Sequence, residues 1–341
     1  MNALTSVVTV RRALPADAAA IGDFVARHPE SSLFQRPEWT AAVERGCGQR
    51  ARTLLAQDPR GALVGLLPLT QMRSPLFGSA LVSAGFGIGG GVLGDGADAL
   101  GEAAWNLARE LGCASVELRG GRLPAGWERK EGTYANFARD LPDADDAILA
   151  SIPRKQRAEV RRALGFELEV SVGRDLSDHY RVYSESVRNL GTPVFPRSLF
   201  AAMIETFGDD ADVLTVSRDG RPLASVLSLY HRGTVYPYWG GGTAEARRWR
   251  ANDLLYYELM RHALRRGCTR FDFGRSKLGT GAFAFKKNWG FAPEPLVYAV
   301  KGEAREVNPM SPRYRVQTTA WKRLPLWLAN RIGPWIARGL G

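Results

Sequence analysis

Two short turns, Asp219-Gly220 and Arg232-Gly233, constrain the fold more than any other feature of the chain. Each turn joins two apolar runs, and a two-residue turn that contains glycine suits a β-hairpin. Residues 213–239 are therefore predicted to form a three-stranded antiparallel meander. A helix over 252–266 and a strand over 269–273 are predicted to follow it. This succession of elements indicates a mixed α/β fold.

The rest of the chain alternates in the same way. Strands are predicted at 7–13, 51–57, 62–72, 115–119, 134–141 and 167–172, and helices at 15–27, 37–46, 97–111, 143–164, 176–190 and 197–207, with an interruption of the 143–164 helix at Pro153. Two α/β halves without a legible sequence repeat predict a duplicated domain with a boundary near Pro142. The predicted domains are 1–142 and 143–303, followed by a basic tail, 304–341.

Composition narrows the class of protein. Hydrophobic residues make up 45% and charged residues 24% of the 341 residues, as in soluble globular proteins. The three cysteines and four histidines lack pairing or metal-ligand spacing, so we predict neither a disulfide framework nor a metal site.

Charge and hydropathy bear on partners and location. The net charge of +11 favours an anionic partner such as a phosphorylated cofactor, nucleic acid or an anionic membrane surface. We see no signal peptide and no uniformly apolar span, so a cytoplasmic protein is predicted.

Residues 269–300 combine glycines and cations between a strand and a short helix. The predicted strand ends in Gly274-Arg275-Ser276-Lys277, a glycine loop follows, and the helix 283–289 precedes a last strand at 296–300. Free backbone N–H groups, a helix dipole and cations suit a bound anion, for which Arg275 and Lys277 are candidates. The alternative is a core strand with an amphipathic helix whose lysines are merely solvated.

A second junction of this kind follows the meander. Its predicted donor-binding residues are Tyr238, Gly240, Gly241, Gly242, Arg247, Arg248, Arg250 and Asn252, the last as the cap of the helix. Three consecutive glycines are costly in a plain loop, which favours a ligand site. The glycine-rich stretch 85–91 has no nearby cations and is interpreted as a tight hairpin or a groove wall.

The densest basic run is 152–162. On a helix, Arg154, Arg157 and Arg161 share one face, and Lys155 and Arg162 share another. Two basic stripes would grip phosphates, although a solvated surface helix explains them equally well.

Four side chains near the junctions are candidates for proton transfer: Asp272, Glu258, Tyr256 and Tyr298. Asp272 ends an apolar strand, where burial would raise its pKa. A structural pair with Arg275 is the alternative for this carboxylate.

The pairing of I-P-R-K-x-R-A-x-V-R-R-A (Ile152–Ala163) with D-F-G-R-S-K-x-G-T-G-x-F-x-F-K-K-x-W-G-F-x-P (Asp272–Pro293) resembles the FemAB-like branch of the GNAT acyltransferase superfamily. The tail between Asn308 and Pro334 is similar to the subgroup found with exosortase/PEP-CTERM exopolysaccharide systems. The resemblance implies an α+β fold of tandem GNAT-like domains, each a twisted, mostly antiparallel sheet flanked by helices.

The same resemblance implies transfer of an acyl or aminoacyl group to an amine of a cell-envelope or peptidoglycan precursor. Lys286, in the Phe285-Lys286 pair, would neutralise charge at the reactive end of the donor, and Asp272 is a second catalytic candidate. Arg154, Lys155, Arg157 and Trp289 are the candidate substrate-binding residues.

The donor stays open between acyl-CoA and aminoacyl-tRNA. The chain lacks both the Q/R-x-x-G-x-G/A donor loop of GNAT enzymes and the coiled-coil arm of some tRNA-using members. No tightly bound cofactor is expected. No cysteine or serine has the setting of a nucleophile, so direct transfer in a ternary complex is predicted.

The C-terminal segment has six basic residues and no acidic residue after Glu306, together with Trp321, Trp327 and Trp335. This pattern suits a peripheral membrane contact within 304–341, and a lipid-linked acceptor would agree with it. The alternative is a tail that packs its tryptophans back onto the body. Pro325 and Pro334 are predicted to prevent a single long helix.

Two functions without catalysis also fit these features. The basic charge fits a tRNA- or RNA-binding module. The tail fits a membrane-associated scaffold of exopolysaccharide assembly.

Overall fold

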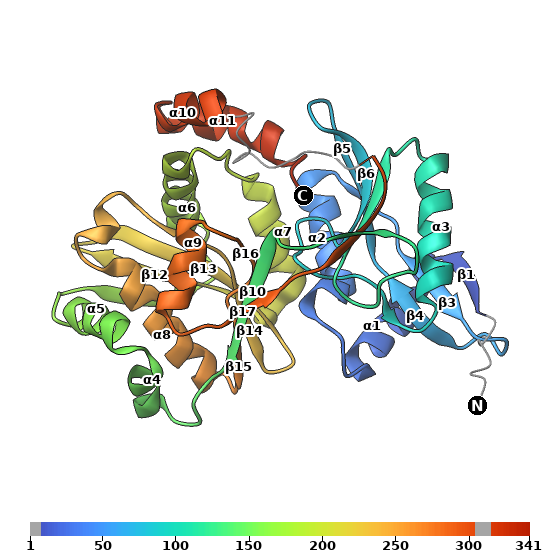
Figure 1. Ribbon diagram of the computed structural model, residues 1–341. Helices are drawn as coiled ribbons and strands as arrows, with labels where there is room; N and C mark the ends of the chain where they lie inside the picture. Colours follow the sequence, from blue (N-terminus) through green and yellow to red (C-terminus); the bar gives the residue numbers. More distant parts are fainter. Residues whose placement is uncertain (1–7, 304–314) are drawn as a thin grey trace. The chain divides into compact units, whose positions relative to one another are not determined.

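The computed structural model describes residues 8–303 and 315–341 (Figure 1). These residues form two compact units. Unit one comprises 8–131, 297–303 and 338–341, and unit two comprises 132–296 and 315–337. The division therefore falls before Pro142 and is discontinuous in sequence. The predicted start of the tail, at 304, lies outside the described residues.

Unit one contains two sheets, ordered β1-β3-β4-β7 and β2-β5-β6-β8-β18-β9. Its elements are β1 (Thr9–Arg12), η1 (Pro15–Asp17), α1 (Ala18–Arg27), η2 (Leu33–Gln35), α2 (Pro37–Cys47), β2 (Arg50–Ala51), β3 (Leu54–Gln57), β4 (Leu63–Leu67), β5 (Leu69–Ser74), β6 (Gly78–Ser83), β7 (Leu93–Gly94), α3 (Ala97–Glu110), β8 (Ser115–Arg119), β9 (Glu128–Lys130) and β18 (Tyr298–Gly302). The single strand predicted at 62–72 is wrong. Pro68, which has no N–H to donate to a ladder, separates β4 from β5, and the two strands belong to different sheets.

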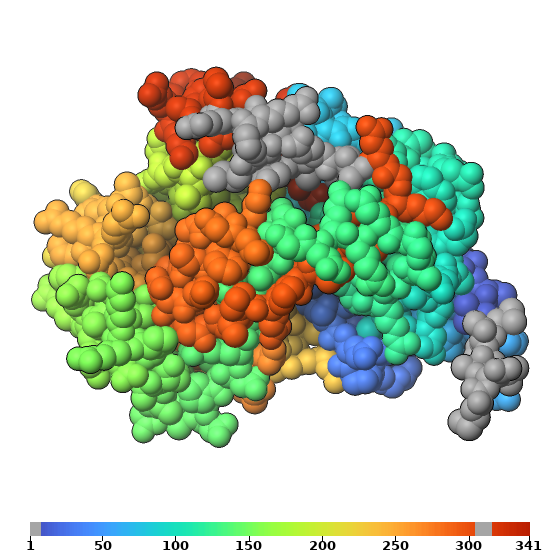
Figure 2. All heavy atoms as spheres, in the orientation of Figure 1, coloured from blue at the N-terminus to red at the C-terminus, as the bar shows by residue number. Residues whose placement is uncertain are grey.

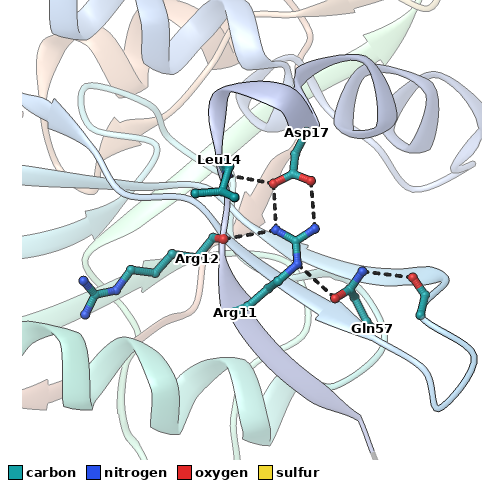
Figure 3. A network of polar contacts seen from close by, with 6 residues as sticks. Arg11, Arg12, Leu14, Asp17 and Gln57 are labelled. Atoms are coloured by element: carbon teal, nitrogen blue, oxygen red, sulfur yellow. Dashed lines mark hydrogen bonds and ion pairs between the residues drawn. The ribbon is translucent and has the colours of Figure 1, made fainter.

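A polar network joins the first strand of unit one to its neighbours (Figure 3). Both terminal nitrogens of the Arg11 guanidinium donate to the Asp17 carboxylate at 2.7 Å, and Arg11 Nε donates to Gln57 Oε1 at 2.9 Å. The backbone N–H of Leu14 also donates to Asp17. These bonds lower the pKa of Asp17 to about 2. Arg11 thereby ties β1 both to β3 and to the start of the first helix.

The glycine-rich stretch of unit one is held by buried side chains. Trp39 Nε1 donates to the carbonyl of Gly85 at 2.9 Å, an Arg119 terminal nitrogen donates to that of Gly87 at 2.8 Å, and the Tyr298 hydroxyl donates to that of Ile88 at 3.2 Å. The glycines themselves lie against Phe34 and Ala84, so added Cβ atoms would clash. Packing therefore explains this stretch.

Unit two is built on one sheet, ordered β11-β12-β13-β14-β15-β10-β16, with β17 also paired to β10. Its elements are β10 (Tyr134–Asp140), α4 (Asp145–Ser151), α5 (Arg154–Leu164), β11 (Glu169–Gly173), α6 (Ser177–Leu190), α7 (Arg197–Phe207), η3 (Gly208–Asp210), β12 (Ala211–Arg218), β13 (Arg221–His231), β14 (Thr234–Gly242), η4 (Glu245–Arg247), α8 (Ala251–Arg265), β15 (Arg270–Asp272), β16 (Ser276–Lys277), α9 (Gly281–Asn288), β17 (Pro293–Pro295), α10 (Arg315–Lys322) and α11 (Leu326–Ala337).

The meander of β12, β13 and β14 confirms the prediction from the two turns. Asp219, Gly220, Arg232 and Gly233 all have positive φ, between 48° and 69°. Two consecutive left-handed residues match the right-handed twist of paired strands. The predicted interruption at Pro153 is also confirmed, because α4 ends before it and α5 begins after it.

Helices α6 and α8 cover opposite faces of the sheet of unit two. A Cβ on Gly240 would lie 3.1 Å from the Tyr256 hydroxyl of α8, whereas a Cβ on Gly241 would lie 2.4 Å from Ser186 Oγ of α6. Successive residues of a strand point to opposite faces. The end of β14 is therefore enclosed from both sides.

The last two helices, α10 and α11, pack against α6. Pro325 separates them, as predicted, but Pro334 lies inside α11 and does not end it. No helix within 8–303 and 315–341 is long and apolar enough to cross a membrane.

Candidate functional site

Strands β14 and β15 run parallel and then part. They are paired only at Thr234↔Arg270 and Val235↔Phe271, so residues 236–242 of β14 have no strand partner on that side among the described strands. Strand β14 also has a bulge in its pairing with β13. Because of this bulge, Tyr238 lies opposite no residue of β13. A strand that parts from its parallel neighbour is a place where an extended ligand can pair with the backbone.

The three glycines at the end of β14 are required by packing. Gly242 lies under both side-chain ends of Asn252, each 2.8 Å from the position of an added Cβ, and Gly240 and Gly241 face Tyr256 and Ser186 as described above. Larger residues would push the flanking helices away from β14. The glycines thus shape the junction sterically.

Helix α8 begins at this junction without a side-chain cap. Its N-cap is Arg250, in the left-handed region at φ 54°, and not Asn252 as predicted. Arg250 Nε instead lies 2.6 Å from Glu159 Oε2 of α5. An uncapped helix start with positive dipole suits an anionic group. The junction and the basic helix α5 are therefore in direct contact.

The predicted phosphate-gripping residues divide into two groups. Arg157 donates to the carbonyls of Ala150 and Ile152, and so holds the end of α4. Arg154, Lys155, Arg247 and Arg248 are exposed. This second group, like Arg161 of α5, is accessible to a ligand.

The ammonium group of Lys286 lies just beyond the end of β15, and not at the start of a helix. Its side chain leaves the last turn of α9, and Nζ donates to the carbonyls of Gly274 and Arg275, both at 2.9 Å. The start of α9 is capped by Thr280. Burial lowers the pKa of Lys286 to about 7, against the opposing effect of Asp272. This ammonium changes its charge near neutral pH.

Asp272 is a buried carboxyl group close to Lys286. Burial raises its pKa, while hydrogen bonds from the Gly274 N–H, at 2.9 Å, and from Asn136 lower it. Asn136 comes from β10, a strand distant in sequence, and was missed by the sequence analysis. The Arg275 guanidinium lies 4.7 Å from the centre of the Tyr134 ring.

Tyr256 connects the two diverging strands. Its hydroxyl faces Gly240 of β14, and its ring lies 4.7 Å from that of Phe273, the residue that follows β15. Burial raises its pKa to about 12. The hydroxyl forms no hydrogen bond with any residue that the structure describes.

The other candidates have structural roles. Glu258 is paired with Arg261 at 3.0 Å, and Tyr298 belongs to unit one. Trp289, predicted to bind substrate, is fully buried in the core of unit two. Trp289 therefore has a packing role in place of the predicted contact with substrate. Lys277 lies on β16, opposite Tyr134 of β10.

Unit one contains a separate cavity of about 540 Å³, lined by residues that include Cys47, Gln49, Arg73 and Arg338. No residue predicted as a site residue lines it. Within 8–303 and 315–341, no group of three or more His, Cys, Asp or Glu side chains is arranged to hold a metal ion.

The sheet and the divergence of β14 from β15 define a GNAT-type acyltransferase fold. Residues 151–287 match the family model described as an acetyltransferase (GNAT) domain. The matched residues lie within unit two. No curated protein matches the chain.

Several solved structures resemble most of the chain, including the following three. FemX is 17% identical, with a TM-score of 0.64 over 85% of this chain and 96% of that one. The tandem GNAT protein from the clavulanic acid biosynthesis pathway is 14% identical, with a TM-score of 0.57 over 87% and 98%. The C-terminal domain of a putative lysylphosphatidylglycerol synthetase from Agrobacterium fabrum is 15% identical, with a TM-score of 0.56 over 84% and 92%. The α+β, tandem GNAT fold is confirmed.

Proposed function

We propose that this protein transfers an acyl or aminoacyl group from an activated donor to an amine of a cell-envelope or exopolysaccharide precursor, directly and in a ternary complex. The observation that carries the proposal is the divergence of β14 from β15 beyond Val235, next to the start of α8, which has no side-chain cap. Lysylphosphatidylglycerol, in the name of one similar structure, is an aminoacyl lipid, and this agrees with aminoacyl transfer.

Lys286 would stabilise the negative charge that forms on the carbonyl oxygen of the donor. An ammonium has three donors, and two of them are used by the carbonyls of Gly274 and Arg275. The third N–H has no acceptor among the described residues. A buried donor aimed at a developing oxyanion contributes roughly 3 kcal/mol in known sites.

Tyr256 and Asp272 are the residues that would handle protons. The Tyr256 hydroxyl faces Gly240 of β14 and has no hydrogen-bond partner among the described residues, while its ring contacts that of Phe273. A hydroxyl kept neutral by burial would donate a proton to the leaving group. Asp272 would act by holding Lys286 in its cationic form, because a nearby carboxylate favours the ammonium.

The donor would be acyl-CoA or aminoacyl-tRNA, both of which carry phosphates. The exposed cations of α5 and of the β14–α8 junction support either choice. Arg154 and Lys155 lie on α5, and Arg247 and Arg248 lie at the junction that Glu159 links to α5. A tRNA would contact more phosphates than CoA, so its affinity would fall more steeply with salt.

The test is a transfer assay with radiolabelled acetyl-CoA and, separately, charged tRNA as donors, and a panel of amino sugars as acceptors. We expect Lys286→Met to lower kcat/KM with the active donor by at least about 100-fold, which corresponds to roughly 3 kcal/mol of transition-state stabilisation.

Lys287→Met is the matched control, because Lys287 is the next residue of α9 and is exposed. It should keep more than half of the activity. Equal activities of the two variants would remove Lys286 from the site. Tight, salt-dependent tRNA binding without transfer from either donor would instead favour the RNA-binding alternative.

A further inference from the structure

Helix α11 displays its large apolar side chains and buries its small ones. Ala329, Gly333 and Ala337 are its buried residues. Trp327 is 69% exposed, Trp335 is 50% exposed and Ile332 is 38% exposed. An amphipathic helix of a globular protein has the opposite arrangement, with its largest apolar residues toward the core. Exposed apolar surface of this kind marks an interaction site.

The helix is held firmly in this orientation. Gly333 lies so close to α11's neighbour that an added Cβ would be 3.1 Å from the backbone nitrogen of Val194. Asn330 Nδ2 donates to Ser184 Oγ of α6 at 3.2 Å. The small residues thus allow close packing on unit two, and the tryptophans are directed outward. The alternative of a tail that packs its tryptophans back onto the body does not hold for Trp327 and Trp335, because α11 packs through its small residues.

The exposed face combines tryptophan with positive charge. Trp327, Arg331 and Trp335 are spaced at i, i+4 and i+8, so they form one stripe along the helix. Residues 315–341 contain five basic residues and no acidic residue. Figure 2 shows the last two helices, in red, at the surface.

We propose that the exposed face of α11 docks on an anionic phospholipid surface. Indole rings prefer the headgroup level of a bilayer, where arginine and lysine meet lipid phosphates. A helix of 12 residues lies in the plane of such an interface rather than across it. A segment without acidic side chains complements anionic lipid, whereas the rim of a protein interface usually carries both signs of charge. This inference does not depend on the proposed transfer reaction.

Flotation of the full chain with vesicles tests the proposal. Vesicles of phosphatidylcholine with 30% phosphatidylglycerol, a composition chosen for the assay, are compared with pure phosphatidylcholine at low and high salt. We expect the protein to float with the anionic vesicles and to be released by salt. Trp327→Ala/Trp335→Ala should lower the partition coefficient at least about tenfold, because membrane affinity follows the buried apolar area.

The control is Leu14→Ala/Leu164→Ala, which removes two exposed apolar side chains elsewhere. It should partition like the wild type. Circular dichroism confirms that both double variants are folded. Failure of the wild type to float, or equal flotation of the tryptophan variant, would overturn the proposal. Sedimentation that reveals a tryptophan-dependent dimer without vesicle binding would also overturn it, in favour of a second copy of the chain as the occupant.

Discussion

The two units contain the same local succession of elements with different contents. In unit one, β6, a glycine-rich segment, α3 and the parallel strand β8 follow one another. In unit two, β14, which ends in three glycines, α8 and the parallel strand β15 do the same. In unit one, Trp39, Arg119 and Tyr298 donate to carbonyls of the glycine-rich segment. In unit two, β14 parts from β15 after Val235.

Under the proposed function, this contrast separates a donor site in unit two from a counterpart in unit one that side chains fill. Lys286 and Asp272, whose pKa values are shifted by burial, both belong to unit two. The family model for GNAT acetyltransferases also matches residues 151–287, within unit two.

The largest predicted effect in this comparison is on the pH dependence of stability, and it comes from the buried amine of Lys286. The pKa of Lys286 is about 7 in the folded chain, below its ordinary value, so between pH 7 and 10 the unfolded chain binds a proton that the native chain lacks. The stability of the wild type should therefore rise with pH in this window relative to Lys286→Met. The relative gain should reach up to about 4 kcal/mol, at 1.36 kcal/mol per pH unit.

Denaturant unfolding at several pH values measures this gain. Lys287→Met should follow the wild type throughout. A difference between wild type and Lys286→Met that stays flat from pH 7 to 10 would show that Lys286 is not desolvated in solution.

A smaller effect separates two tyrosine hydroxyls, one in each unit. Tyr298→Phe leaves the carbonyl of Ile88 without its donor and should cost about 1 kcal/mol of stability, with little change in transfer. Tyr256→Phe removes a hydroxyl that has no hydrogen-bond partner within 8–303 and 315–341, so stability should be unchanged or higher, while kcat falls about tenfold. Thermal unfolding and the transfer assay report the two quantities. Loss of stability without loss of rate in Tyr256→Phe would make that hydroxyl structural.

Much of the fold was predictable because its signals are local. The turns at Asp219-Gly220 and Arg232-Gly233, and the break at Pro153, depend on backbone preferences of single residues. The division into units was not predictable in the same way. Strand β10 pairs with β15 and strand β18 pairs with β8, and such pairings join segments more than 100 residues apart.

The types of residue at the candidate site were easier to predict than their geometry. Lys286 was found from its motif, but the carbonyls that bind it, its lowered pKa and the role of Asn136 depend on distant strands. Trp289 was misinterpreted because an aromatic residue in a short motif carries no signal of its burial. The three consecutive glycines were likewise interpreted as a sign of ligand binding. Their packing against helices α6 and α8 requires them, and these helices lie elsewhere in the sequence.

The central claim is that the donor binds in unit two and not in the filled counterpart of unit one. Hydrogen–deuterium exchange with saturating acetyl-CoA, and with charged tRNA in parallel, tests it most directly, because it locates protection along the chain. The account predicts protection of residues 236–252 and of the segment after β15, with residues 84–96 unchanged. Protection of residues 84–96, with 236–252 unaffected by a donor that binds, would contradict it.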